Sequence, residues 1–86
     1  MTIMKKVFAL EILTPDKRVF KGDVVQATMP GADAPFVILY NHAPIISVLG
    51  KGKLFWNDGN DTCSVDISCG FVEVNNNMGT ACVELK

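Results

Sequence analysis

Short stretches in which apolar and polar residues alternate with a period of two recur along the whole chain, and turn residues separate them. Residues 7–13 read VFALEIL and residues 24–29 read VVQATM, so that successive side chains point to opposite faces of an extended strand. Residues 14–17 (TPDK) and 57–60 (NDGN) have the composition of tight turns. Strand-like stretches that recur about every 8–12 residues are typical of an all-β sandwich or barrel.

We therefore predict an all-β fold: a small β-sandwich or flattened barrel of about 8–10 short, mainly antiparallel strands. A hairpin is expected around residues 57–60, and a second one where residues 70–74 and 80–85 flank a turn at residues 75–79. The one helical element expected is a short turn near residues 41–44, capped by Asn41 and limited by Pro44. Because 86 residues are too few for two cores, we expect residues 1–86 to form a single domain.

The chain has more apolar material than a domain of this size can bury. Hydrophobic residues make up 49% of the sequence and charged residues 20%, whereas a chain of this length buries only about 60–65% of its unfolded surface. We expect part of the apolar surface to face a protein partner. The 8 Lys and Arg residues balance 9 Asp and Glu residues and form no basic cluster, which argues against binding to nucleic acid.

Three cysteines, Cys63, Cys69 and Cys82, leave two interpretations open. Their odd number and irregular spacing do not fit a disulfide framework and favour a reducing compartment. We expect all three to pack as small hydrophobic side chains. The alternative is a small zinc domain with a Cys₃His site that includes His42. Because no pair of cysteines has the close spacing of a zinc knuckle, we expect no metal and no other cofactor.

Sequence motifs for catalysis are absent. The chain contains no nucleophile elbow, no phosphate-binding loop and no dinucleotide fingerprint. Glu11, Glu73 and Glu84 each alternate with apolar neighbours, so we expect them at the solvent surface rather than paired as acid and base. The longest uncharged apolar run, residues 34–50, contains polar residues and prolines and is too short to span a bilayer.

Four motifs follow one another in a fixed order. They are LEILTP at 10–15, VFKGDV at 19–24, FVILYNHAP at 36–44 and SCGFVEV at 68–74. Together they resemble the N-terminal β-sandwich of the epsilon subunit of F-type ATP synthases, over about residues 8–84. The chain departs from that family where Ala34, Val37 and Cys69 stand in place of usual glycines and Tyr40 in place of a usual proline. Because glycine permits backbone conformations that other residues avoid, we expect the loop at residues 33–35 to follow its own path.

The resemblance implies a non-catalytic subunit of the central stalk of the proton-transporting ATP synthase. Such a subunit binds the gamma subunit and the membrane c-ring and couples proton-driven rotation to ATP synthesis. Longer members continue into a C-terminal helical hairpin that is tied to restraint of ATP hydrolysis and, in some, to nucleotide binding. Since the sequence ends at Lys86, we expect a short form without the inhibitory helices, which couples but does not switch and binds no nucleotide.

By the same resemblance, the protein is expected to lie on the cytoplasmic face of the bacterial inner membrane, peripherally, as part of the synthase. The alternative that remains open is a generic β-sandwich binding module.

The resemblance also assigns contact residues. The expected c-ring contacts are Asp33, Ala34, Pro35, His42, Ala43 and Pro44. The expected gamma contacts are Ile45, Ile46 and Ser47, and the two isoleucines are equally compatible with the core. For His42 two roles stay open, a hydrogen bond to the local backbone of its own turn or a polar contact across the interface.

Overall fold

The computed structural model describes residues 6–86, which form eight strands and, within that range, no helix. The first five residues of the domain expected at 1–86 lie outside the described residues. The strands are β1 Phe8–Leu13, β2 Arg18–Val24, β3 Gln26–Met29, β4 Phe36–Leu39, β5 Ile45–Leu49, β6 Gly52–Asn57, β7 Thr62–Asn75 and β8 Met78–Leu85. The all-β class and the number of strands that the sequence predicts are confirmed.

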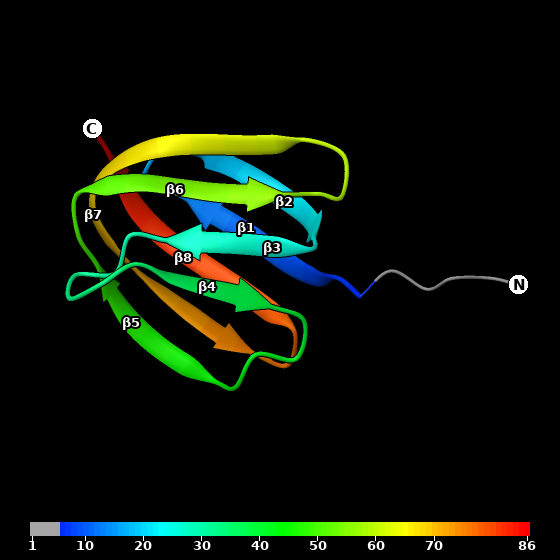
Figure 1. Cartoon of the computed structure of the whole chain (residues 1–86). Helices are drawn as coiled ribbons and strands as arrows, with labels where there is room; N and C mark the ends of the chain where they lie inside the picture. Colours follow the sequence, from blue (N-terminus) through cyan, green and yellow to red (C-terminus); the bar gives the residue numbers. More distant parts are fainter. Residues whose placement is uncertain (1–5) are drawn as a thin grey trace, which may run out of the picture.

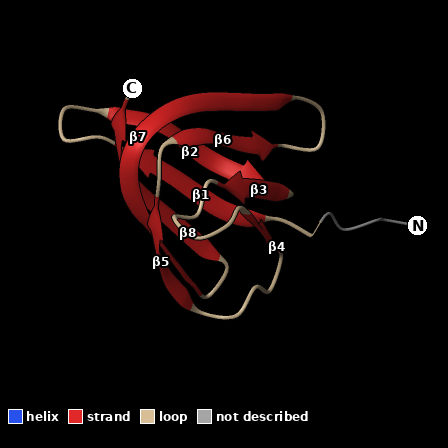
Figure 2. Cartoon of the chain, turned by 60° about the vertical axis from the view of Figure 1, so that its left-hand side comes forward, coloured by secondary structure: helices blue, strands red, loops and turns tan. Residues whose placement is uncertain are grey.

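The long strand β7 belongs to two layers. Residues 62–67 pair with β6, and β3 and β4 follow beyond it; we call this layer sheet II. Residues 69–75 lie between β5 and β8, and β1 and β2 follow beyond β8; we call this layer sheet I. Figures 1 and 2 show β7 curving from one layer into the other. All pairs are antiparallel except β1 with β8.

The bend in β7 lies near Gly70. The β7–β8 register shifts between Ile67 and Cys69, so the strand changes direction where it leaves sheet II. A Cβ added at Gly70 would lie 2.5 Å from the carbonyl oxygen of Cys82 and 2.9 Å from the Cα of Val83. Only glycine therefore lets β7 approach β8 this closely.

The inward faces of the two sheets meet in one apolar core. Its buried residues alternate along each strand, as the period of two predicts. Sheet I contributes Phe8, Leu10, Ile12, Val24, Leu49, Val72, Val74, Ala81 and Val83, and sheet II contributes Ala27, Met29, Ile38, Leu54, Trp56 and Ile67. The rings of Phe20 on β2 and Trp56 on β6 lie 4.9 Å apart between centroids, which joins the two layers beside this core.

Both hairpins expected from the sequence form. Residues 58–61 connect β6 to β7, and the backbone N–H of Asp58 donates to the carbonyl oxygen of Asp61 at 3.2 Å. Between β7 and β8 the turn consists of two residues, Asn76 and Asn77, with φ of 51° and 57°. Two positive φ values in a two-residue loop define a type I′ turn, whose twist matches that of the flanking strands.

The helical turn expected near residues 41–44 does not form. Asn41 has a φ of 62°, which is left-handed and interrupts a right-handed helix. The N–H of His42 donates to the carbonyl oxygen of Leu39 at 3.1 Å, so the chain makes a single tight turn there.

The prediction that all three cysteines pack in the core is wrong. Cys63 and Cys69 are exposed, and Cys82 is only half-buried. Burial decreases along β7 from Ile67 through Val65 to Cys63, because the strand leaves the core towards its hairpin. Cys69 follows the register shift and lies on the solvent side of sheet I.

The segments in residues 6–86 that have regular structure are all strands, and none of this part of the chain forms a helix of the length and apolarity needed to cross a membrane.

Candidate partner-binding surfaces

Four apolar side chains form a continuous row across the outer face of sheet I. Val48 lies opposite Phe71, Phe71 opposite Cys82, and Cys82 opposite Leu13. Side chains directly opposite one another on neighbouring strands are close enough to contact. Val48 is 66% exposed and Phe71 48% exposed, while Cys82 and Leu13 are half-buried. We call these four residues the apolar row.

A shallow groove of about 460 Å³ adjoins the apolar row at the β1–β2 turn. Its walls come from Leu13, Pro15, Gly70, Phe71 and Cys82, among others, and are largely apolar. An apolar side chain of a protein partner would fit such a hollow as an anchor.

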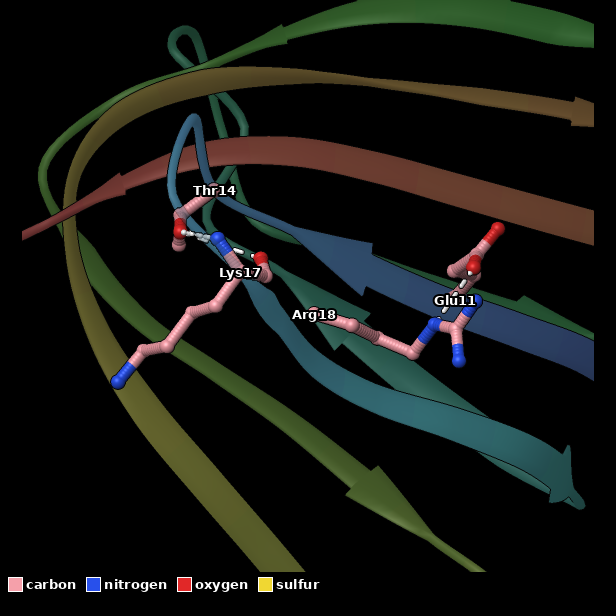
Figure 3. A network of polar contacts seen from close by, with 4 residues as sticks. All are labelled: Glu11, Thr14, Lys17 and Arg18. Carbon is pink, nitrogen blue, oxygen red and sulfur yellow. Dashed lines mark hydrogen bonds and ion pairs between the residues drawn. The ribbon is translucent and has the colours of Figure 1, made fainter.

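Polar side chains border the apolar row. The neighbouring row on the same face places Ile46 opposite Glu73, Glu73 opposite Thr80, and Thr80 opposite Glu11. The Nε of Arg18 donates to Oε2 of Glu11 at 3.0 Å (Figure 3). An apolar centre with a charged and polar border is the usual anatomy of a protein–protein interface.

The turn at residues 14–17 holds this polar border in place. The Oγ1 of Thr14 accepts the N–H of Lys17 at 3.1 Å (Figure 3) and the N–H of Asp16 at 3.3 Å. The N–H of Thr14 donates to the carbonyl oxygen of Lys17 at 2.8 Å. The turn that the sequence predicts at these residues is confirmed. It determines where β2 begins, at Arg18.

The outer face of sheet II has no comparable row. Phe55 is 39% exposed and lies opposite Thr28 on one side and Ser64 on the other. Val37 lies beyond Thr28, so a hydroxyl-bearing side chain separates the two apolar ones. The exposed apolar residues of this face, which include Val37 and Leu39 on β4, are therefore not aligned with one another across neighbouring strands.

The structure does not bring together the two halves of the expected c-ring contact. Asp33–Pro35 leads into β4, whereas His42–Pro44 follows it, so that the two segments lie at opposite ends of this strand (Figure 1). The four residues of β4 span about 13 Å at ~3.3 Å per residue.

The loop that carries Asp33–Pro35 is fastened at its base and exposed at its tip. The N–H of Ala32 donates to the carbonyl oxygen of Val48 at 3.0 Å, and the N–H of Gly50 donates to that of Pro30 at 2.8 Å. A Cβ added at Gly31 would overlap the carbonyl oxygen of Ala34, so the loop folds back tightly on itself. Asp33, Ala34 and Pro35 are all exposed.

His42 makes a bond to its own turn. Its Nδ1 lies 2.7 Å from the carbonyl oxygen of Ala43. Because a carbonyl oxygen only accepts, this contact requires the proton on Nδ1 and leaves Nε2 as an acceptor when the ring is neutral. The local backbone role that the sequence left open for His42 is confirmed, and Ala43 and Pro44 beside it are exposed.

The three residues expected to contact gamma divide between two faces of β5. Ile46 points outward and is 75% exposed. Ile45 packs against the core, and Ser47 is half-buried on the same inward side. The core alternative therefore holds for Ile45 and not for Ile46.

Sequence reasoning missed the apolar row as a unit. The signal was present in part, because residues 45–49 (IISVL) and 70–74 (GFVEV) carry apolar side chains at both positions of the alternation. Such stretches predict a strand with apolar residues on both faces. This pattern does not indicate which strands lie side by side or in which register they pair.

Within residues 6–86, no group of three or more His, Cys, Asp or Glu side chains is close enough together to hold a metal ion. Cys69 instead lies beside Glu84, with 3.6 Å between Sγ and Oε2. The geometry gives no support to the Cys₃His alternative.

Comparison with protein families agrees with the fold. Residues 7–84 match the family described as ATP synthase, Delta/Epsilon chain, beta-sandwich domain.

Two curated relatives illustrate the similarity. The chain is 42% identical over 76 residues to an ATP synthase epsilon chain of Maridesulfovibrio salexigens, which covers 88% of this chain and 54% of the relative. It is 40% identical over 81 residues to an epsilon chain of Nitratidesulfovibrio vulgaris, covering 94% of this chain and 60% of the relative. The chain thus spans little more than half the length of these relatives.

A solved structure has the same fold at low sequence identity. A chain in the cryo-EM structure of the Euglena gracilis mitochondrial ATP synthase, OSCP/F1/c-ring, superposes with a TM-score of 0.83 and 20% identity. The match covers 96% of this chain and 53% of the other.

Proposed function

The chain belongs to the family of ATP synthase delta/epsilon chain β-sandwich domains, and from this premise we propose that it is a non-catalytic subunit of the central stalk of a rotary ATP synthase. In this role it binds the gamma subunit and the c-ring and passes proton-driven rotation on to ATP synthesis. The observation that carries the proposal is the apolar row of sheet I. A small protein rarely leaves such a continuous apolar surface exposed, so we expect a partner to cover it.

We place gamma on the outer face of sheet I. Val48 and Phe71 supply exposed apolar area on this face, and the groove beside Phe71 would receive an anchoring side chain of gamma. Ile46 extends the same face towards the β4–β5 connection. A contact that bears torque has to be large and well packed, and interfaces of permanent complexes are the more apolar ones.

We assign the c-ring contact first to Asp33, Ala34 and Pro35. This loop is fastened at its base and exposed at its tip, where Asp33 carries a carboxylate, which suits a contact with the polar loops of the ring. His42, Ala43 and Pro44 remain candidates for a contact at the opposite end of β4. A single flat ring surface would touch both segments only if the edge strand β4 lay along it.

Three further points belong to the proposal. Residues 1–86 act as one domain of the stalk. The protein is a peripheral part of the membrane-bound synthase, on the cytoplasmic face of the bacterial inner membrane. ATP is made and hydrolysed on other subunits, and this chain supplies neither a catalytic residue nor a nucleotide site.

Calorimetry of the purified chain with its cognate gamma subunit tests the first part of the proposal. We expect a one-to-one complex. Val48→Asp places a charge at the β5 end of the apolar row, next to Phe71, and is expected to weaken binding by more than about a hundredfold, because an unpaired charge would be buried. Val37→Asp on the outer face of sheet II is the matched control and is expected to bind like the unaltered chain.

Absence of binding between two folded proteins would contradict the proposal and favour a generic β-sandwich binding module. Equal loss in Val48→Asp and Val37→Asp would place the interface elsewhere. The ring contact is tested by photo-crosslinking in the assembled synthase, with the reactive group at Asp33 or at His42. A ring adduct from His42 and none from Asp33 would reverse our assignment.

A further inference from the structure

Two asparagines from distant parts of the chain are joined by a reciprocal pair of hydrogen bonds. The backbone N–H of Asn41 donates to Oδ1 of Asn77 at 2.7 Å, and Nδ2 of Asn77 donates to Oδ1 of Asn41 at 3.0 Å. Both residues have a positive φ, 62° and 57°. We call this pair of bonds the asparagine clamp.

The clamp ties the β4–β5 connection, which itself lies outside the strand ladders, to the turn between β7 and β8. Asn41 lies between β4 and β5, and these two strands pair with β3 and β7, not with each other. Asn77 lies in the turn between β7 and β8, and its carbonyl oxygen accepts the N–H of Ala9 at 2.9 Å. Asn77 is therefore held by sheet I on one side and holds the β4–β5 connection on the other.

Asparagine suits both positions for two reasons. It is among the residues that adopt left-handed φ most readily after glycine. Its amide also offers an acceptor and a donor at the same time, which the reciprocal pair requires. Glycine at position 77 would satisfy the backbone and lose both bonds.

We propose that Asn77 is a positioning residue that sets the conformation of the β4–β5 connection for binding of gamma. The connection ends at Pro44, which lines a shallow hollow of about 350 Å³ together with Ile46 of β5 and Glu73 and Asn75 of β7. The clamp holds the connection three residues before Pro44. The identity of the partner rests on the proposed function, whereas the clamp itself does not.

Hydrogen exchange of the Asn41 amide in the isolated chain tests the clamp without a partner. Asn77→Gly removes both bonds and keeps a turn that accepts positive φ, since Asn-Gly is a favoured two-residue hairpin loop. We expect the Asn41 amide to exchange roughly five to ten times faster, in keeping with the loss of one hydrogen bond. Asn76→Gly changes the neighbouring residue of the same turn and is expected to leave this rate unchanged.

Binding of the cognate gamma subunit tests the positioning role. We expect Asn77→Gly to bind about three- to tenfold more weakly, because an untethered segment has to be ordered on binding. Asn76→Gly is expected to bind normally. Asn77→Asp keeps the acceptor for the Asn41 N–H but loses the donor to Oδ1 of Asn41, so it is expected to restore exchange protection and affinity in part, which a general loss of stability would not predict.

The outcomes separate the two proposals. An unchanged Asn41 exchange rate in Asn77→Gly would overturn the clamp. Faster exchange with undiminished gamma binding would overturn the positioning role and leave the proposed function standing. An unaltered chain that does not bind gamma at all would overturn the proposed function and the positioning role together, while the exchange rates would still decide on the clamp.

Discussion

The outer faces of the two sheets differ although their inner faces are alike. Both sheets send alternate apolar side chains into one core. On the outside, sheet I aligns Val48, Phe71 and Cys82 in register, whereas sheet II places Thr28 and Ser64 on either side of Phe55. Sheet I therefore aligns apolar side chains across several strands, whereas on sheet II a hydroxyl-bearing residue separates Phe55 from Val37.

The largest effects are expected where the sheets are equivalent. Leu10 of sheet I and Leu54 of sheet II are both buried, so Leu10→Ala and Leu54→Ala should each lower the free energy of unfolding by about 2–5 kcal/mol. Urea denaturation followed by circular dichroism measures both. A loss confined to one variant would show that the layers do not share one cooperative core.

The next largest effect should separate the two outer faces. Phe71→Ala is expected to weaken gamma binding by about 2 kcal/mol, roughly thirtyfold, as for an aromatic anchor at an interface centre. Phe55→Ala removes an equally large, similarly exposed ring from sheet II and should change binding by less than about 0.5 kcal/mol. Calorimetry with gamma measures both affinities. A larger loss of affinity in Phe55→Ala than in Phe71→Ala would place the interface on sheet II.

The bend that joins the sheets should tolerate no side chain. Gly70→Ala is expected to lower the free energy of unfolding by about 1–3 kcal/mol, because the added methyl group forces the backbone of β8 away. Gly79→Ala is the control. The atom nearest to its added Cβ would be Cδ1 of Leu10 at 3.5 Å, so this substitution should change the free energy of unfolding very little. Thermal unfolding of both variants measures the contrast, and equal values would remove the special role of the bend.

The smallest effect concerns the ion pairs of the two outer faces. On sheet I, Nε of Arg18 lies 3.0 Å from Oε2 of Glu11. On sheet II, Nζ of Lys53 lies 4.0 Å from Oδ1 of Asp66. Double-mutant cycles should give about 0.2–1 kcal/mol for the first pair and close to zero for the second, because exposed pairs contribute little. Raising the salt concentration should weaken the first coupling; a stronger coupling in sheet II would contradict this order.

Local chemistry made much of the fold predictable. The period of two in residues 7–13 placed Phe8, Leu10 and Ile12 on one face, and all three are buried. Turn residues located both hairpins and the turn at Thr14–Lys17. The prediction of a helical turn at residues 41–44 was wrong, because no local sequence rule predicts that Asn41 has a left-handed φ and donates a hydrogen bond to Asn77.

The candidate surfaces were predictable only in part. Surplus apolar composition predicted a partner surface, and Ile46, which was expected to contact gamma, is exposed on the outer face of sheet I. Ile45 and Ser47 face inward, because neighbouring residues of a strand point to opposite sides. The apolar row depends on four strands being adjacent in register, which is a property of pairing and not of any one stretch.

The sequence by itself determined which segments extend, where they turn and which side of each strand is apolar, because these depend on neighbours along the chain. Only the tertiary structure decided that β7 serves both sheets and that Val48, Phe71, Cys82 and Leu13 form one row. Those relations join residues that are far apart in sequence. They result from strand pairing, from the bend at Gly70 and from the packing of the two layers.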